Sequence, residues 1–262
     1  MRLARLLKRI NRENVETGFA DLEISSLACN SQEVQDGALF IAINGNRSRG
    51  SDFIGQAVKN GAVCVISDSE KPDSRYKGIP FISLPDTRYA VSVLADEFFG
   101  HPCGRLKIAG ITGTNGKTTI TYLIKSILEQ ANLSCGIVGT INYSFKEKII
   151  PAPNTTPGPL ELHKLLKQMA DAGCGYCAME VSSHALDQKR TEAIAFAAAI
   201  FTNLTQDHLD YHLNLENYFL AKARLFSALQ PDGYAIINLD SPFAFRLKSL
   251  SRGRFLSYGL RE

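Results

Sequence analysis

The sequence lacks any hydrophobic run long enough to cross a lipid bilayer. Its longest apolar run covers residues 193–201, whereas a spanning helix needs about 20 apolar residues. The first residues, MRLARLLKRINRE, place basic side chains among the leucines, which breaks the apolar core that a signal peptide requires. These leucines recur at helical spacing, so we favour a packed first helix over the alternative of a membrane-surface helix.

The sequence also lacks the closely spaced cysteines that are typical of small secreted, disulfide-bonded domains. The six cysteines are spread along the chain and do not form the dense framework of a small secreted domain. Cys174 and Cys177 make one C-x-x-C, but no second pair or histidine at metal spacing accompanies it. We therefore interpret the cysteines as reduced thiols rather than zinc ligands, and we expect a cytoplasmic protein without a membrane partner.

A strong excess of charge of either sign is missing as well. The 262 residues carry a formal net charge of +3, and 45% are hydrophobic. This mild balance suits anionic small molecules and does not predict a nucleic-acid partner, which would favour a clustered basic face. The length allows one large domain or two smaller ones, and no internal repeat or low-complexity tract is present.

Short β-branched runs alternate with helical patterns along the chain, which predicts an α/β fold. We divide it into a small α/β domain at residues 1–103 and a second, incomplete domain with a parallel sheet at 104–262, joined by a linker near 100–105. In the first domain we expect strands at 38–43, 62–67 and 80–84, and helices at 53–60 and 87–99. In the second we expect strands at 106–112, near 137, and at 176–181, 195–202 and 234–239, helices at 117–132 and 160–172, and a long loop at 143–159.

A glycine-rich loop follows the strand expected at 106–112. Residues 110–119 read GITGTNGKTT, and a helix is expected directly after them, which is the context of a phosphate-binding loop. Gly113 and Gly116 allow the backbone N–H groups to face a polyphosphate, Lys117 can reach its terminal phosphates, and the Thr118 hydroxyl can bind Mg²⁺. The predicted nucleotide site comprises Gly113, Thr114, Asn115, Gly116, Lys117, Thr118 and Thr119. Ile111 stands where the strict motif has glycine, so a simple glycine-rich turn is the alternative.

Further segments follow this loop in a fixed order. They are NTTP at 154–157, MEVSSHALDQKR at 179–190, TNLTQDHLDYH at 202–212 and NYFLAKARLF at 217–226. Together with TGTNGKTT they resemble the Mur ligase family, and within it the UDP-N-acetylmuramoyl-tripeptide synthetases. The resemblance covers nearly the whole chain and is weaker in the first hundred residues. It implies an N-terminal uridine-nucleotide domain followed by a P-loop-type ATPase domain.

The resemblance also implies a reaction. The family transfers the γ-phosphate of ATP to a peptide carboxylate, and the amine of an amino acid then attacks the acyl phosphate. We expect the third amino acid to be added in this way to UDP-N-acetylmuramoyl-L-alanyl-D-glutamate, in peptidoglycan precursor synthesis. The chemistry requires the negative charge of the carboxylate and phosphates to be neutralised, which Mg²⁺ and Lys117 can do without a covalent enzyme intermediate.

The expected metal and catalytic residues lie at strand ends and on one helix. Glu180 ends the apolar run CAMEV, where a carboxylate is a natural Mg²⁺ ligand; the alternative is a strand-end glutamate that faces solvent. The resemblance implies that His208 is a second metal ligand and that Lys222 is carbamylated and positions a metal. From the residues alone, a structural histidine and an exposed helix lysine are the alternatives. The predicted catalytic residues are thus Lys117, His208 and Lys222, and the metal ligands are Thr118, Glu180, His208 and Lys222.

The resemblance also implies two sets of substrate contacts. The contacts to the muramoyl peptide are Asn154, Thr155, Thr156, Ser182, Gln188 and Arg190. The contacts to the uridine nucleotide are Cys29, Ser31, Asn46, Arg47 and Ser48. The chain departs from the family pattern at Asn30-Ser31-Gln32, where Asp-Ser-Arg is usual, and at Arg49-Gly50, where Asp-Gly is usual. NLDSPF at 238–243 replaces the usual Asn-x-Asp-Asp.

Mur ligases have a third, C-terminal domain that receives the amino acid, and the resemblance places none of it in this chain. We therefore expect a monomeric fragment that binds ATP weakly and has little ligase activity alone. Whether meso-diaminopimelate, lysine or another amino acid is added stays open. Two alternative functions are a folylpolyglutamate synthase-like ligase and a non-catalytic nucleotide-binding remnant.

Overall fold

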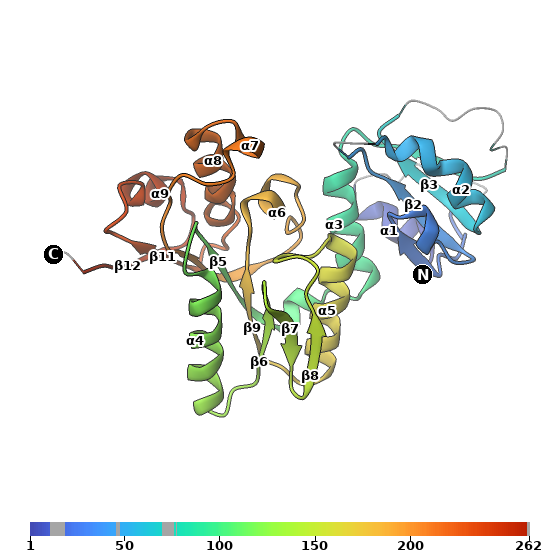
Figure 1. Ribbon diagram of the computed structural model, residues 1–262. Helices are drawn as coiled ribbons and strands as arrows, with labels where there is room; N and C mark the ends of the chain where they lie inside the picture. Colours follow the sequence, from blue (N-terminus) through green and yellow to red (C-terminus); the bar gives the residue numbers. More distant parts are fainter. Residues whose placement is uncertain (11–18, 46–47, 70–75, 77, 261–262) are drawn as a thin grey trace. The chain divides into compact units, whose positions relative to one another are not determined.

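The computed structural model describes residues 1–10, 19–45, 48–69, 76 and 78–260. Contacts divide the chain into two compact units, Met1–Gly100 and His101–Glu262, which are described separately (Figure 1). Each unit has its own sheet of mainly parallel strands with helices packed on it. The predicted fold class, α/β with two sheet-containing regions, is confirmed. Within the described residues, no helix is both long and apolar enough to span a membrane.

Unit 1 is built on a four-stranded parallel sheet in the order β1-β2-β3-β4. All five residues of β2, ALFIA, are buried, because helices and loops cover both faces of a parallel sheet. The strands are β1 (Ser26–Ala28), β2 (Ala38–Ala42), β3 (Ala62–Ser67) and β4 (Phe81–Ser83), and the helices are α1 (Leu3–Lys8), α2 (Ile54–Lys59) and α3 (Thr87–Phe98), with short 3-10 helices at Ser31–Glu33 and Gly50–Phe53. The predicted first helix is confirmed as a packed one, since Leu3, Leu6 and Leu7 are buried.

Unit 2 contains an eight-stranded sheet in the order β12-β11-β10-β5-β9-β6-β7-β8. The strands from β12 to β6 are parallel, with β5 near the middle. Their carboxyl ends therefore meet at one edge of the sheet, where ligands bind in such folds. The parallel strands are β5 (Lys107–Thr112), β6 (Cys135–Val138), β9 (Tyr176–Glu180), β10 (Phe196–Phe201), β11 (Tyr234–Asn238) and β12 (Arg254–Tyr258).

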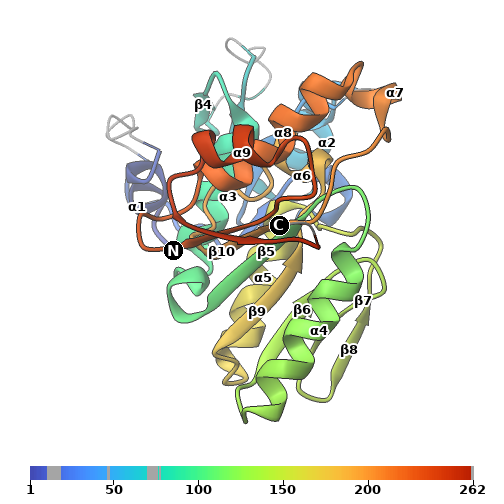
Figure 2. The same cartoon turned by 90° about the vertical axis from the view of Figure 1, so that its left-hand side faces the viewer.

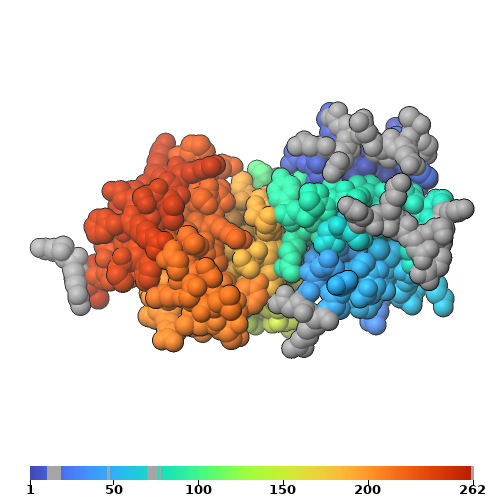
Figure 3. All heavy atoms as spheres, turned by 90° about the horizontal axis from the view of Figure 1, so that it is seen from above, coloured from blue at the N-terminus to red at the C-terminus, as the bar shows by residue number. Residues whose placement is uncertain are grey.

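Helices cover both faces of this sheet, and Figure 2 shows α4 and α5 beside it from a second side. Helix α4 packs on a small core around Ile111 and Ala178. Helices α5 and α8 pack on the larger core of the other face, which includes both Cys174 and Cys177. The helices are α4 (Lys117–Gln130), α5 (Pro159–Asp171), α6 (Ser183–Asp187), α7 (Leu209–His212), α8 (Leu215–Ser227) and α9 (Ala244–Leu250), with a 3-10 helix at Pro102–Arg105. In Figure 3 the orange surface of α7 and α8 adjoins the red surface of α9.

The long loop predicted at 143–159 is wrong over its first half. It contains an antiparallel hairpin of β7 (Asn142–Phe145) and β8 (Lys148–Pro151) that extends the sheet. Tyr143 and Phe145 of β7 are buried, but this strand is too short and too polar to show a clear alternating pattern in the sequence. The sheet is consequently mixed at this edge. Helix α9 and strand β12 were not predicted from the sequence either.

The core of unit 2 gives a direct test of the packing. Leu166 on α5 is fully buried, so Leu166→Ala should lower the free energy of unfolding by about 2–5 kcal/mol, as large-to-small core substitutions do. Lys164→Ala, at an exposed position of the same helix, should change it by less than about 0.5 kcal/mol. Urea denaturation followed by circular dichroism measures both, and equal effects would show that α5 is not packed as described.

Candidate functional site

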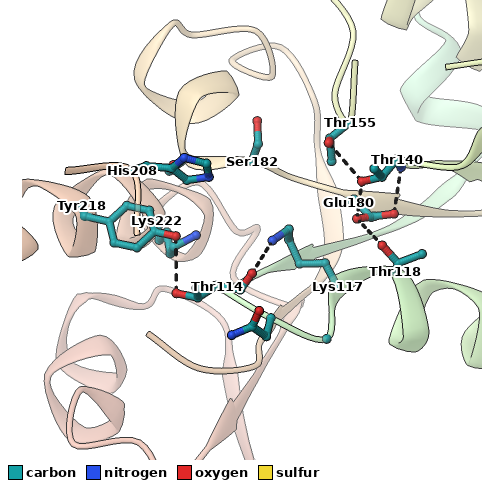
Figure 4. Close-up of a pocket in the computed structure, with 13 residues that line it drawn as sticks. Thr114, Lys117, Thr118, Thr140, Thr155, Glu180, Ser182, His208, Tyr218 and Lys222 are labelled. Carbon is teal, nitrogen blue, oxygen red and sulfur yellow. Dashed lines mark hydrogen bonds between the residues drawn. The ribbon is translucent and has the colours of Figure 1, made fainter. Parts of the chain in front are cut away.

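A polar cavity of about 270 Å³ lies at the carboxyl edge of the sheet in unit 2. Its walls come from the loop after β5, the start of α4, the ends of β6 and β9, and α8 (Figure 4). The lining residues are Thr114, Asn115, Gly116, Lys117, Thr118, Thr140, Thr155, Glu180, Ser182, Ser183, His208, Tyr218 and Lys222. The predicted metal and catalytic residues, Lys117, Thr118, Glu180, His208 and Lys222, are therefore all brought to one cavity.

The loop between β5 and α4 depends on two glycines. Gly113 has φ +149°, and a Cβ there would lie 1.8 Å from the hydroxyl oxygen of Thr202, so a side chain cannot be accommodated. Gly116 has φ +84° and precedes α4 as its N-cap. This left-handed conformation is readily adopted by glycine, and it directs the chain into the helix whose N-terminus lines the cavity.

Two lysine ammonium groups converge on this loop. Lys117 Nζ donates to the carbonyl oxygens of Gly113 and Thr114, each at 2.9 Å. Lys222 Nζ donates to the same Gly113 oxygen at 2.9 Å. Burial lowers the pKa of Lys117, although Glu180 and Asp207 oppose the shift. Burial, and secondarily the charge of Lys117, lowers the pKa of Lys222 to about 7, against the influence of Asp207.

Lys222 lies inside the fold. Its residue exposure is 1%, and its Nζ is 4.3 Å from the ring centroid of Tyr218, one helical turn earlier on α8. Tyr218 in turn lies within 3.4 Å, hydroxyl to hydroxyl, of Thr114. The alternative of an exposed helix lysine is therefore wrong. Figure 4 shows Lys222, Tyr218 and His208 on one side of the cavity and Glu180 on the other, with Lys117 between them.

Glu180 is the buried carboxylate of the site, with 1% exposure. Its Oε2 accepts from the hydroxyl of Thr118 at 2.9 Å and from that of Thr140 at 3.1 Å, and its Oε1 accepts from the backbone N–H of Thr140 at 2.9 Å. A Cβ on Gly139 would come within 2.4 Å of Oε1, so glycine is needed beside it. The alternative of a solvent-facing glutamate is wrong, because three hydrogen bonds hold this carboxylate inside the cavity.

The oxygen atoms of Thr118 and Glu180 fit a magnesium ion. The two oxygen atoms are hydrogen-bonded at 2.9 Å and both residues line the cavity, so one cation could contact both. Both are hard oxygen donors, the type that Mg²⁺ prefers. His208 is the N-cap residue of α7, with φ +52°, and its ring packs against His184 at 5.0 Å and Tyr218 at 6.1 Å between centroids.

Some of the residues expected to contact the muramoyl peptide line the cavity, and others form hydrogen bonds within the fold. Thr155 and Ser182 line the cavity. Thr156 is buried and donates to the backbone oxygen of Glu180 at 2.8 Å, so its hydroxyl serves the fold. The guanidinium of Arg190 donates through Nη2 and Nε to the side-chain oxygen of Gln188, at 2.7 and 3.1 Å.

The remaining predicted residues lie elsewhere. Asn154 is exposed, and its carbonyl accepts from the hydroxyl of Tyr143 at 2.6 Å. Thr119 is exposed on α4 and is not among the residues that line the cavity. Cys29, Ser31 and Ser48 belong to unit 1, where Ser31 is buried and Ser48 is exposed. Asn46 and Arg47 lie outside the described residues.

Sequence reasoning missed three lining residues, namely Thr140, Ser183 and Tyr218. Thr140 follows β6 at the same sheet edge as the other site residues, so a polar residue two positions after a buried strand was the available signal. Ser183 and Tyr218 stand within the segments that carried the family resemblance. Tyr218 is four residues before Lys222, a spacing that places both on one face of a helix.

Comparison with known protein families and proteins agrees with this geometry. The model of the Mur ligase middle domain matches residues 111–262, and the model described as the Mur ligase family catalytic domain matches residues 23–99. A UDP-N-acetylmuramoyl-L-alanyl-D-glutamate–2,6-diaminopimelate ligase of Geobacter metallireducens is 42% identical over 266 residues, which cover 99% of this chain and 52% of the relative. The ligase of the same name from Gloeobacter violaceus is 45% identical over 247 residues, 94% of this chain and 50% of the relative.

Solved structures give the same grouping. A ligase of that name superposes with a TM-score of 0.85 at 28% identity, covering 100% of this chain and 53% of that one. The fold alone is shared with a MurF ligase from Thermotoga maritima, at a TM-score of 0.60 and 20% identity over 92% of this chain and 52% of that one. The chain thus spans about half the length of these relatives. Because the middle-domain model alone matches more than half of its residues, the chain belongs to the Mur ligase family.

Proposed function

We propose that the protein containing this chain is an ATP-dependent ligase of peptidoglycan precursor synthesis. Its substrate would be UDP-N-acetylmuramoyl-L-alanyl-D-glutamate, and the added amino acid would be 2,6-diaminopimelate, as named for the relatives from Geobacter metallireducens and Gloeobacter violaceus. One observation carries the proposal: the buried Lys222, the half-buried Lys117 and the buried carboxylate of Glu180 face the same cavity at a phosphate-type loop.

The positive side of the cavity suits a polyphosphate. The N-terminus of α4 offers unpaired backbone N–H groups and a favourable dipole to an anion. Lys117 and Lys222 share a neutral carbonyl oxygen, which is a weaker partner for an ammonium group than a phosphate oxygen would be. A bound triphosphate would therefore take Lys117 from the loop carbonyls, and the Lys117 ammonium group would face the charge that develops on the transferred phosphoryl group.

The negative side suits the metal of a nucleotide substrate. Thr118 and Glu180 would hold Mg²⁺, and Thr140 fixes the orientation of the carboxylate by two hydrogen bonds. Bound there, the ion would neutralise charge on phosphate and acyl-phosphate oxygens. Thr155 and Ser182 place hydroxyl groups on the adjoining wall, where they can orient the substrate carboxylate for attack on phosphorus. No residue of the chain needs to act as a covalent nucleophile.

Lys222 is proposed to be carbamylated, as the family resemblance implies. A carbamate forms when a neutral amine attacks CO₂ and loses a proton, and burial makes the neutral amine accessible near pH 7. The product is an anion, which would relieve the repulsion between Lys222 and Lys117 and offer oxygen atoms toward the cavity. His208, half-exposed at the start of α7, would complete the metal environment on this side.

The ligase proposal is tested by phosphate release from the full-length gene product that contains this sequence. Release should require MgATP, UDP-muramoyl dipeptide and diaminopimelate together, and replacement of diaminopimelate by lysine should lower it strongly. Phosphate release with a folate and glutamate instead would support the folylpolyglutamate synthase-like alternative. Nucleotide binding without turnover on any of these substrates would support a non-catalytic module. The 262-residue chain alone should bind ATP weakly and turn over little.

Glu180→Gln should lower kcat by about 10²-fold or more, the range observed when one preorganised electrostatic group is removed from an active site. Glutamine keeps the size and the acceptor oxygen of the side chain but loses the charge that a cation requires. Steady-state kinetics at several Mg²⁺ concentrations should show a raised metal requirement. Glu147→Gln, in the exposed turn between β7 and β8, is the matched control, and an equal effect in both variants would contradict the assignment.

Carbamylation should depend on pH through the lysine amine. Its pKa of about 7 means that the neutral, reactive amine becomes the main form as pH rises above 7. At a fixed concentration of dissolved CO₂, incorporation of isotopically labelled carbon at residue 222 should therefore increase between about pH 6 and 8, as measured by NMR. Lys222→Arg should show none of this signal. A wild-type signal that first appears near pH 10, the range of an ordinary lysine, would refute the buried-amine explanation.

A further inference from the structure

A segment about 90 residues later in the sequence forms hydrogen bonds with the phosphate loop. Residues 202–205, here called the brace, follow β10 and run beside the loop that follows β5. Thr202 donates to the backbone oxygen of Asn115 at 2.6 Å, and the backbone N–H of Thr205 donates to the hydroxyl of Thr114 at 3.0 Å. The brace is itself tied to β11, because Asn238 donates to the backbone oxygen of Thr202 at 2.8 Å.

Asn203 contacts three successive peptide units of the loop. Its backbone oxygen accepts from the N–H of Thr114 at 2.9 Å. Its side-chain oxygen accepts from the N–H of Asn115 at 3.0 Å, and its side-chain nitrogen donates to the carbonyl oxygen of Asn115 at 3.2 Å. The amide of Asn203 therefore pairs with Asn115 through both a donor and an acceptor, which fixes the loop backbone more tightly than one bond would.

The hydrogen bonds to Asn203 determine the direction in which the C=O and N–H groups of each loop peptide point. In a trans peptide the C=O and the following N–H point to opposite sides. The N–H groups of Thr114 and Asn115 point to Asn203, so the carbonyls of Gly113 and Thr114 point to the lysines. The next peptide is reversed: the carbonyl of Asn115 points to the brace, and the N–H of Gly116 points to the opposite side, where Gly116 lines the cavity.

We propose that Asn203 is a positioning residue for the nucleotide. Its side chain holds the reversed peptide between Asn115 and Gly116, so that the Gly116 N–H faces the β- and γ-phosphate groups of a nucleoside triphosphate. The inference rests on the proposed function for the identity of the ligand, since it specifies which residue prepares the loop for that ligand. Asn203 itself acts through the loop and has no required contact with the reacting atoms.

The test is binding of ADP and of a non-hydrolysable ATP analogue, with Mg²⁺, to the gene product by calorimetry. Asn203→Ala removes two hydrogen bonds to the loop and should raise the Kd for the ATP analogue about tenfold, since each such bond contributes about 0.5–1.5 kcal/mol and 1.4 kcal/mol is a factor of ten. Asn203→Asp keeps the acceptor for Asn115 but turns the donor into a carboxylate oxygen, so binding should weaken further. Gln206→Ala, at an exposed position just beyond the brace, is the control and should bind like the wild type.

Kinetics separate positioning from a loss of stability. Asn203→Ala should raise KM for ATP while KM for the UDP-muramoyl dipeptide stays unchanged, whereas partial unfolding would only reduce the active fraction and hence kcat. Wild-type affinity for the ATP analogue in both Asn203 variants would overturn the inference, and so would a lowered Tm with unchanged Kd. Because calorimetry needs no turnover, a protein without ligase activity would refute the proposed function and leave the Asn203 result to be judged separately.

Discussion

The site depends on the donation of two ammonium groups, one from the buried Lys222 and one from the half-buried Lys117, to a single backbone carbonyl, that of Gly113. Removal of charged groups from water is costly unless they are paired and hydrogen-bonded, and a neutral oxygen compensates only part of that cost. The lowered pKa values of Lys117 and Lys222 are the result. An anion in the cavity would supply the missing compensation, and this is the electrostatic reason for proposing that the cavity binds a polyphosphate and that Lys222 itself becomes an anionic carbamate.

The opposite wall complements this arrangement. Glu180 is satisfied by neutral donors from Thr118 and Thr140 rather than by either lysine. The positive and negative groups therefore stay on separate sides of the cavity and do not neutralise one another in an ion pair. A substrate that carries both phosphate groups and a divalent cation matches such a divided cavity, because each component meets the wall of opposite charge.

Much of the fold and part of the site could be predicted from the sequence, because those features depend on neighbours in the chain. The strand, glycine turn and helix around Lys117 are local, and so is the position of Glu180 at the end of an apolar strand. The burial of Lys222 was not predictable from Ala221 and Ala223 beside it, since the packing of α8 decides which face is covered. The β7–β8 hairpin also depends on tertiary contact, as its buried Tyr143 pairs across the sheet.

The phosphate loop also shows why a motif of ten residues does not determine its own geometry. Gly113 is required less by its φ angle alone than by the Thr202 hydroxyl, which occupies the place of a Cβ. The backbone N–H of Asn115 donates to Asn203, 88 positions later, and its carbonyl oxygen accepts from both Thr202 and Asn203. The loop conformation that exposes the N-terminus of α4 to a ligand thus depends on two segments, one after β5 and one after β10, and these two strands are neighbours in the sheet. Parallel pairing brings the carboxyl ends of these strands together, so that the segment after β10 can form hydrogen bonds with the loop after β5.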